Sequence, residues 1–248
     1  MAAASKTDRA LATAGLFHAY GESWVLQEIE LQLEPGSTLA VIGANGAGKS
    51  TLLRILGGLL RPTAGRVEVM GAELPRQAHL IRARVGFLGH RPLIYRDLTV
   101  VENLGFGARL FGLAGAGRER IAELLELVRL DHRRDTRAGE LSAGMLQRLA
   151  ICRAVLHRPE LLLLDEPLAH LDPDAASTVA PLIGPAAGRS RVLVTHDISA
   201  ALADADQVLA LGRDGQVAYR GPAAELDERA ARAVYAERAG GIRAGAST

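Results

Sequence analysis

The feature that most constrains this chain is a glycine-rich octapeptide between an apolar segment and a helical pattern. Residues 43–50 read Gly-Ala-Asn-Gly-Ala-Gly-Lys-Ser, which satisfies the spacing G-x-x-x-x-G-K-[ST]. Residues 38–42 are typical of a buried strand, and leucines at helical spacing run from Leu52 to Leu60 before Pro62. Strand, glycine-rich loop and helix in this order predict a βα unit whose loop binds phosphate groups.

Each residue type in the loop has a physical reason to be there. Glycines have no side chain, so the backbone N–H groups of the loop can close around phosphates. Lys49 can reach the β and γ oxygens, and Ser50 can ligate Mg²⁺. Lys49 is also one of only two lysines in the chain. A glycine-rich turn with a chance lysine is the alternative, and the flanking strand and helix disfavour it. The residues assigned to phosphate binding are Gly43, Ala44, Asn45, Gly46, Ala47, Gly48, Lys49, Ser50 and Thr51.

Composition excludes several other classes of protein. The 248 residues are 48% hydrophobic and 23% charged, which is typical of a packed globular chain and not of a disordered or fibrous one. A net charge of +1 provides no long-range field for polyanions, so we do not expect a nucleic-acid partner. Cys152 is the only cysteine, which favours a reducing compartment. No apolar run reaches the roughly 20 residues of a membrane span.

Hydrophobic periodicity predicts an α/β fold with a mainly parallel sheet. Two extended segments within residues 14–33 predict an N-terminal antiparallel β region, and residues 65–70 predict a further short strand. The sheet strands are expected at residues 38–42, 84–88, 161–164 and 191–195, with a helix around 174–183 between the last two.

A helical insertion and a C-terminal helix complete the predicted organisation. Residues 89–154 have a helical pattern that is clearest at 118–130, a hairpin is expected at 208–219, and a helix at 224–238. We therefore expect one domain over residues 1–222, with a helical subdomain at about 89–155, and a C-terminal helix with a frayed tail over 223–248.

A second motif is a run of leucines that ends in two acids. Leu161 to Leu164 predict a buried strand, and Asp165 and Glu166 follow it. Adjacent carboxylates there are costly unless a cation or substrate uses them. We assign Asp165 to Mg²⁺ and Glu166 to deprotonation of an attacking water. The alternative, a plain acidic turn, is disfavoured by the phosphate loop in the same chain.

The third motif is Leu-Ser-Ala-Gly-Met at residues 141–145, ahead of a helix expected to begin near Leu146. Ser142 and the free amides beside it could bind a second anion, although alone they predict only a helix cap. With Gln147 and Arg148 following, the three motifs together resemble the ATP-binding cassette (ABC) ATPase family, over Leu16 to about Pro222.

The resemblance implies a P-loop NTPase fold, ATP and Mg²⁺ as ligands, and ATP hydrolysis. It also implies a homodimer that encloses two ATP molecules, with Ser142 and Gly144 completing the γ-phosphate site of the opposite subunit. Asp172 matches the contact between subunits. Tyr20 matches the aromatic that stacks on adenine, the alternative being an ordinary strand tyrosine. His196, in Val-Thr-His-Asp at 194–197, matches the switch histidine at the γ-phosphate.

Two positions depart from the family pattern. His90 stands at the lid position, where the family usually has Gln, and we assign it to the catalytic group. An imidazole changes charge near neutral pH, so coupling to a partner is expected to be pH-sensitive. Ala143 and Met145 replace the commoner Gly and Gln, so the phosphate contacts there are expected to come from the backbone.

Residues 89–104 resemble more narrowly the ATP-binding subunits of haem exporters that serve cytochrome c maturation. This implies a peripheral position on the cytoplasmic face of the inner membrane, with residues 89–103 gripping separate integral membrane subunits and no direct contact with the transported substrate. Exporters of the ABC-2 type for drugs, polysaccharides or lipids remain open. So does a soluble ABC ATPase of iron–sulfur assembly, whereas a module without turnover is opposed by Glu166 and His196.

Overall fold

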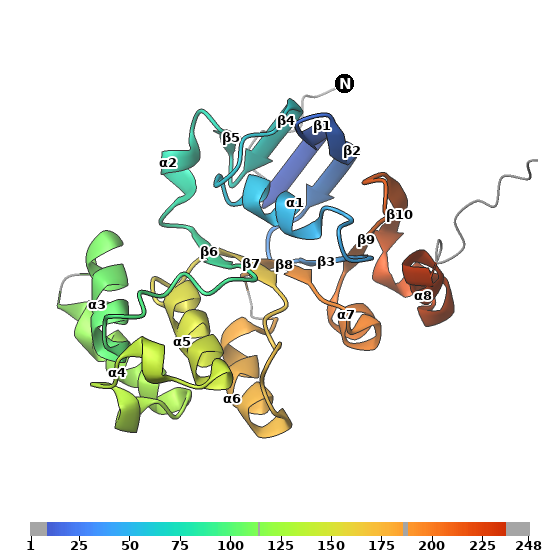
Figure 1. Cartoon of the computed structure of the whole chain (residues 1–248). Coiled ribbons are helices and arrows are strands. Elements are labelled where there is room, and N and C mark those ends of the chain that lie inside the picture. Colours follow the sequence, from blue (N-terminus) through green and yellow to red (C-terminus); the bar gives the residue numbers. More distant parts are fainter. Residues whose placement is uncertain (1–8, 114, 186–187, 237–248) are drawn as a thin grey trace, which may run out of the picture.

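The computed structural model describes residues 9–113, 115–185 and 188–236, which form two sheets with helices packed around them (Figure 1). The first sheet is antiparallel, with strand order β2-β1-β4-β5. Its strands are β1 (Leu11–Tyr20), β2 (Ser23–Leu33), β4 (Ala64–Val69) and β5 (Ala72–Leu74). The predicted N-terminal antiparallel region is therefore confirmed.

The second sheet has six strands in the order β10-β9-β3-β8-β7-β6, and all but β10 are parallel. The parallel strands are β3 (Thr38–Gly43), β6 (Val85–Leu88), β7 (Leu161–Asp165), β8 (Ser190–Val194) and β9 (Gln207–Leu211). Strand β10 (Val217–Pro222) forms the predicted hairpin with β9. The predicted mainly parallel sheet is confirmed.

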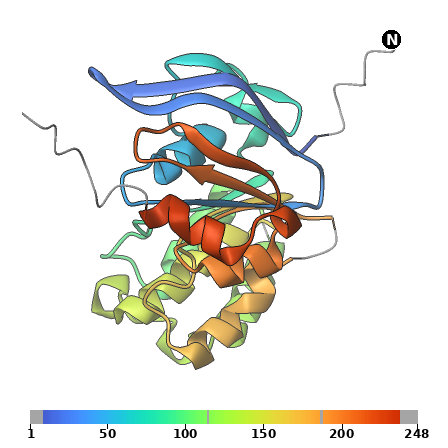
Figure 2. The ribbon, with the colours of Figure 1, turned by 90° about the vertical axis from the view of Figure 1, so that its right-hand side faces the viewer.

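Helices cover both faces of this parallel sheet. In Figure 1, α1 lies between the two sheets, while α3, α4, α5 and α6 gather beyond the parallel sheet and α7 and α8 lie toward its β9 end. Figure 2 shows α8 alongside α7 from the perpendicular direction. The helices are α1 (Lys49–Leu56), α2 (Ala78–Ile81), α3 (Val100–Leu110), α4 (Ala116–Leu127), α5 (Ala143–Val155), α6 (Pro173–Ile183), α7 (Ile198–Asp204) and α8 (Glu228–Ala236).

Strand β7 shows why a run of four leucines forms a single strand. Leu161 and Leu163 pack in the core that includes α1 and the antiparallel sheet, whereas Leu162 and Leu164 pack in the core formed with α3, α4, α5 and α6. Successive residues of a strand point to opposite faces, so a strand covered on both sides must be apolar throughout. A third cluster joins α7 and α8 to β3 and β9.

Three predicted helix boundaries were wrong, each for a local reason. Helix α5 begins at Ala143 and not near Leu146, because the Ser142 hydroxyl accepts the Met145 N–H at 3.3 Å and caps it. Helix α1 ends at Leu56 and not at Leu60, and Gly58 follows it with a φ of +66°. The helical pattern at 118–130 overlaps α4, which ends at Leu127.

Helix α8 begins at Glu228 and not at residue 224, since residues 223–225 form a short 3-10 turn. Asp227 then accepts the Ala230 N–H at 2.6 Å, as a helix cap does. The predicted end of this helix and the predicted tail lie outside the described residues.

The start of the helical insertion also differs from the prediction. Residues 89–99 are not helical, and α3 starts only at Val100. Thr99 and Glu102 form a reciprocal capping box there, which fixes the helix start. Within the part of the chain that the structure describes, no helix combines the length and apolarity needed to cross a bilayer.

Candidate nucleotide site

The phosphate loop connects β3 to α1, and two of its glycines are required by close backbone approach. Gly43 has a φ of +149°, and a Cβ there would lie 2.4 Å from the Leu211 carbonyl oxygen of β9. Gly48 has a φ of +95°, and its Cβ would lie 2.5 Å from the Val25 carbonyl oxygen of β2. The loop is therefore held between strands of both sheets in a conformation that only glycine tolerates at these positions.

Lys49 folds back across this loop. Its Nζ donates hydrogen bonds to the Gly43 carbonyl at 2.6 Å and to the Ala44 carbonyl at 3.0 Å. Burial lowers the pKa of Lys49, and the negative charges of Glu166 and Asp165 oppose that shift. The ammonium group thus lies within the field of both acids at the end of β7.

The N-terminus of α1 provides a second positive feature. Its cap, Gly48, contributes no side-chain hydrogen bond, and the first turn contains no acidic residue. The partial positive charge of the helix end is therefore left without a counter-charge from its own sequence. Ser50 and Thr51 lie in this first turn. An anion placed over the loop would meet both the helix end and the ammonium of Lys49.

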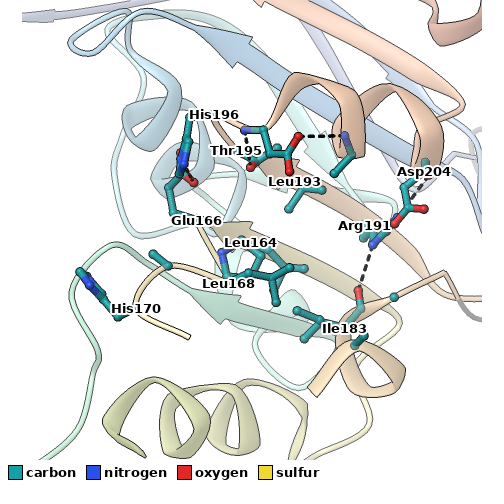
Figure 3. Close-up of a pocket in the computed structure, with 16 residues that line it drawn as sticks. Leu164, Glu166, Leu168, His170, Ile183, Arg191, Leu193, Thr195, His196 and Asp204 are labelled. Atoms are coloured by element: carbon teal, nitrogen blue, oxygen red, sulfur yellow. Dashed lines mark hydrogen bonds and ion pairs between the residues drawn. The ribbon is translucent and has the colours of Figure 1, made fainter. Parts of the chain in front are cut away.

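The acids at the end of β7 meet His196, which follows β8. Asp165 is buried and pairs with Val194 in the sheet. Glu166 donates its backbone N–H to the Val194 carbonyl at 2.9 Å, and its Oε2 lies 2.8 Å from the His196 Nδ1 (Figure 3). The Glu166 side chain is 21% exposed and that of His196 is 77% exposed. The Glu166 carboxylate is thus mostly buried, and its hydrogen-bond partner, the His196 ring, faces solvent.

Sheet order explains why these groups converge. Strands β3, β8 and β7 are parallel neighbours, so their carboxyl ends lie along one edge of the sheet. The phosphate loop, His196 and the acid pair each follow one of these ends directly. The carboxyl edge of a parallel sheet is where α/β folds bind ligands.

A cavity of about 560 Å³ lies beside this edge, between α6 and α7 (Figure 3). Its walls are largely apolar, including Leu164, Leu168 and Leu193. Two of the polar residues that line it have hydrogen bonds: Arg191 donates to Asp204, and Asp197 caps α7. His196 and Glu166 also line it, so the cavity adjoins the carboxyl edge of the parallel sheet.

The other predicted residues lie on separate elements. Tyr20 ends β1, is 49% exposed, and contacts the His18 ring edge to face with centroids 4.8 Å apart. Ser142 caps α5 and Asp172 caps α6. Gly144 packs against the His170 carbonyl oxygen, which would be 3.0 Å from an added Cβ.

His90 is exposed two residues beyond β6. Among the described residues, neither His90, Ser142 nor Asp172 hydrogen-bonds to the phosphate loop. The structure of one chain therefore brings together Lys49, Asp165, Glu166 and His196, but not the residues that the resemblance assigns to the opposite subunit.

One polar residue at the site was not assigned a role from the sequence. Gln147 is buried in α5, and its Nε2 donates to the Pro167 carbonyl at 2.8 Å, beside Glu166. The two residues are twenty positions apart, so no local pattern reveals the bond. The sequence places Gln147 in the motif after Ser142 but does not indicate its bond partner.

Comparison with known families decides the class of this fold and site. The family model described as ABC transporter matches residues 26–169, more than half of the chain. The chain belongs to the ABC transporter family. The match includes the phosphate loop, the Ser142 segment and the acid pair, and it leaves Tyr20, Asp172 and His196 outside. For those three residues, the assigned roles rest on the sequence resemblance.

Two curated proteins similar to this ABC transporter chain differ in the transport that their names state. The Nod factor export ATP-binding protein I of Cupriavidus metallidurans is 38% identical over 71% of this chain and 59% of its own length. The phosphonates import ATP-binding protein PhnC of Frankia casuarinae is 38% identical over 93% of this chain and 96% of its own length. The chain spans about three fifths of the length of the first of these relatives.

Solved structures show the same ABC fold. An ATP-binding subunit of an ABC transporter superposes with a TM-score of 0.79 and 31% identity, covering 86% of this chain and 89% of its own. A bacterial ABC transporter cassette solved as a dimer gives 0.78 and 27%, covering 86% of this chain and 98% of its own.

Proposed function

We propose that this chain is the ATP-binding and ATP-hydrolysing subunit of an ABC exporter. The observation that carries the proposal is the convergence of Lys49, Asp165, Glu166 and His196 at one edge of the parallel sheet. A loop built for phosphate and a sheltered carboxylate beside it are what phosphoryl transfer to water needs.

The donor set at this edge fits Mg²⁺ bound together with a nucleotide. The described residues contain no group of three or more His, Cys, Asp or Glu side chains able to hold a metal. Asp165 and the Ser50 hydroxyl would instead hold the ion with phosphate oxygens and water, as Mg²⁺ prefers. When bound, the ion neutralises charge that develops on the phosphates.

For hydrolysis, one copy of the chain would contribute the residues that meet at this edge of the sheet. Lys49 and the helix N-terminus hold the β- and γ-phosphates, while Glu166 accepts a proton from the attacking water. As the water oxygen bonds to the γ-phosphorus, the bond to the β-phosphate oxygen breaks and ADP leaves. The bond from His196 keeps the Glu166 carboxylate pointed toward that water.

We further propose that two copies of the chain enclose two ATP molecules. Ser142 and Gly144 would complete the γ-phosphate site of the opposite copy, Asp172 would contact it, and Tyr20 would stack on adenine. Within the described residues, neither Ser142 nor Asp172 hydrogen-bonds to the phosphate loop of its own chain, which supports this arrangement, as does the dimeric relative. His90 would act as the lid residue.

A separate membrane subunit would dock on residues 89–103 and hold the chain at the cytoplasmic face of the membrane. A cavity of about 450 Å³ lies there, lined by Leu93, Tyr95 and Leu110 among others. These three side chains are all exposed, although they are large and apolar. Exposed apolar side chains around a hollow are typical of a surface that a partner covers.

The transported substrate is set by that partner and does not touch this chain. The expectation of haem export rests on residues 89–104 alone. The relatives reported above are named for Nod factor export and phosphonate import, so they favour an ABC transporter subunit without favouring haem. We therefore propose export in general, with haem as the specific candidate that the 89–104 segment suggests.

The proposed function is tested by phosphate release from the purified full chain with ATP and Mg²⁺. We expect turnover that EDTA abolishes. Glu166→Gln should still bind ATP but release phosphate at least about 100-fold more slowly, because the base is gone. Turnover by Glu166→Gln at the wild-type rate would remove Glu166 as the base, and no turnover by the folded wild type would contradict the ATPase itself.

A further inference from the structure

The side-chain amide of Gln147 hydrogen-bonds to the turn that carries Glu166, the proposed base. This side chain is 7% exposed and extends from α5 to the turn that follows β7. Its Nε2 donates to the Pro167 carbonyl at 2.8 Å and lies 3.5 Å from the Glu166 carbonyl. A buried amide bonded to the backbone of the proposed base is in a position to fix where that base points.

The backbone of Glu166 needs such a restraint. Its φ is +51°, a left-handed conformation that costs a residue with a side chain about 1–2 kcal/mol. Conformations of this kind persist only where the surroundings hold them. The Val194 carbonyl of β8 binds the Glu166 N–H from one side, and Gln147 binds the next peptide group from α5.

Helix α5 touches the same turn at a second point nearer its start. Gly144 packs against the His170 carbonyl, with room for no larger residue unless the turn shifts. Ser142 caps the same helix one turn before Gln147. The helix that begins with the proposed contact to the opposite ATP therefore bonds directly to the turn that carries Glu166.

We propose that Gln147 is a positioning residue for hydrolysis. Its amide fixes the peptide groups of Glu166 and Pro167 relative to the start of α5, so the carboxylate is correctly placed when Ser142 engages the nucleotide of the opposite subunit. This inference rests on the proposed function. An amide is suited to the task because it donates a hydrogen bond without bringing a charge beside Glu166.

The test compares Gln147→Met, which keeps the size of the side chain but loses the donor, with wild type. We expect kcat for ATP hydrolysis to fall at least about 10-fold with the Kd for ATP changed less than about twofold, because a small misplacement of a reacting group is costly. Gln147→Glu, whose carboxylate repels the Pro167 carbonyl, should lower kcat at least as much and serves the same comparison should the Met variant unfold.

Arg148→Met is the matched control. Arg148 is the next residue of α5, and its Nη1 also donates to a backbone carbonyl, that of Val128 at 2.6 Å, just after α4 and not in the turn that carries Glu166. Losing it removes a comparable bond from the same helix. We expect lower thermal stability but a kcat within about twofold of wild type. An equal fall in kcat for Arg148→Met and Gln147→Met would overturn the proposal, since general loosening of α5 would explain both.

A double variant provides a readout that a purely structural role would not produce. With Glu166→Gln already present, Gln147→Met should lower the residual turnover by less than about twofold, because residues acting as a unit are not additive. Full additivity would contradict positioning through Glu166. If wild type hydrolyses ATP and Gln147→Met does so equally fast, this inference alone fails; if wild type has no turnover, the proposed function fails.

Discussion

The phosphate loop and the segment 89–99 differ in what fixes them. The loop is held between two sheets by backbone contacts that leave no room for a Cβ at Gly43 or Gly48, and Lys49 bonds its carbonyls. Residues 89–99 lie outside any helix or strand and expose Leu93 and Tyr95 to solvent. The proposed nucleotide site is thus fixed by backbone geometry, whereas the proposed docking surface consists of exposed side chains.

Substituting glycines of the phosphate loop tests whether backbone contacts constrain the loop at Gly43. Gly43→Ala should lower the free energy of unfolding by about 3 kcal/mol or more, because its Cβ would collide with the Leu211 backbone. Gly46→Ala is the control: its φ is +84° but no atom lies within 4 Å of the added Cβ, so only the backbone cost of about 1 kcal/mol is expected. Urea unfolding measures both, and equal losses would break the comparison.

Replacing His196 tests its proposed role in orienting Glu166, the proposed base. His196→Ala should lower kcat for ATP hydrolysis about 100-fold while the chain stays folded, because the Glu166 carboxylate loses its 2.8 Å partner. His170→Ala removes another exposed histidine that lines the same cavity but has no bond to Glu166, and it should leave kcat within about twofold. Similar losses in both variants would contradict a specific role for the 2.8 Å pair.

These two tests concern residues whose places in the fold could be predicted from the sequence. The phosphate loop and the acid pair are each set by neighbouring residues, and sheet order then brings their strand ends together. The bond from Gln147 to Pro167 joins residues on different elements and could not be read from local pattern. Buried Arg191 is a further case, since its partners Thr38 and Asp204 lie on distant segments.

The segment 89–99 was predicted less well for a physical reason. Its apolar residues continue the helical pattern of α3, yet the Thr99–Glu102 capping box starts that helix later. Under the proposed function a separate subunit covers Leu93 and Tyr95 and determines the transported substrate, so both depend on the sequence of another chain.

Substituting Leu93 and Tyr95 tests the segment 89–99 independently of the phosphate loop. The double variant Leu93→Ser/Tyr95→Ser should reduce recovery of membrane proteins with the tagged chain about 10-fold, because apolar area at the interface is lost. Basal ATP hydrolysis should change less than about twofold, since neither residue touches the nucleotide edge. Leu80→Ser, equally exposed on α2, is the control and should recover partners as wild type does. Loss of recovery with Leu80→Ser would show that the surface effect is not specific.

The smallest effect is expected at an ion pair that precedes β6 and β7, at the ends of these strands opposite to the proposed nucleotide site. Substitution there should change the stability of the chain and not its ATP hydrolysis. Arg84 and Glu160 bond twice, at 2.6 and 2.8 Å, and Arg84 lowers the pKa of Glu160. Because both side chains are partly exposed, Glu160→Gln should cost less than about 1 kcal/mol of stability at pH 7, with kcat unchanged.

The pH dependence of this pair has a definite sign. A carboxyl whose pKa is lowered by folding contributes stability above its unfolded pKa and loses it as the pH falls through the folded value. The difference in thermal midpoint between wild type and Glu160→Gln should therefore be present at neutral pH and shrink in acid. A difference that grows in acid would contradict the assigned pair.

The most direct measurement is the mass of the Glu166→Gln chain by light scattering, with and without ATP and Mg²⁺. If two copies enclose two nucleotides and hydrolysis is stalled, the mass should rise from 26.2 kDa to twice that value only when ATP is present. Adding Ser142→Arg to the same chain should prevent the rise. A mass that stays at one chain while ATP is bound at saturation would contradict the shared nucleotide site on which the account depends.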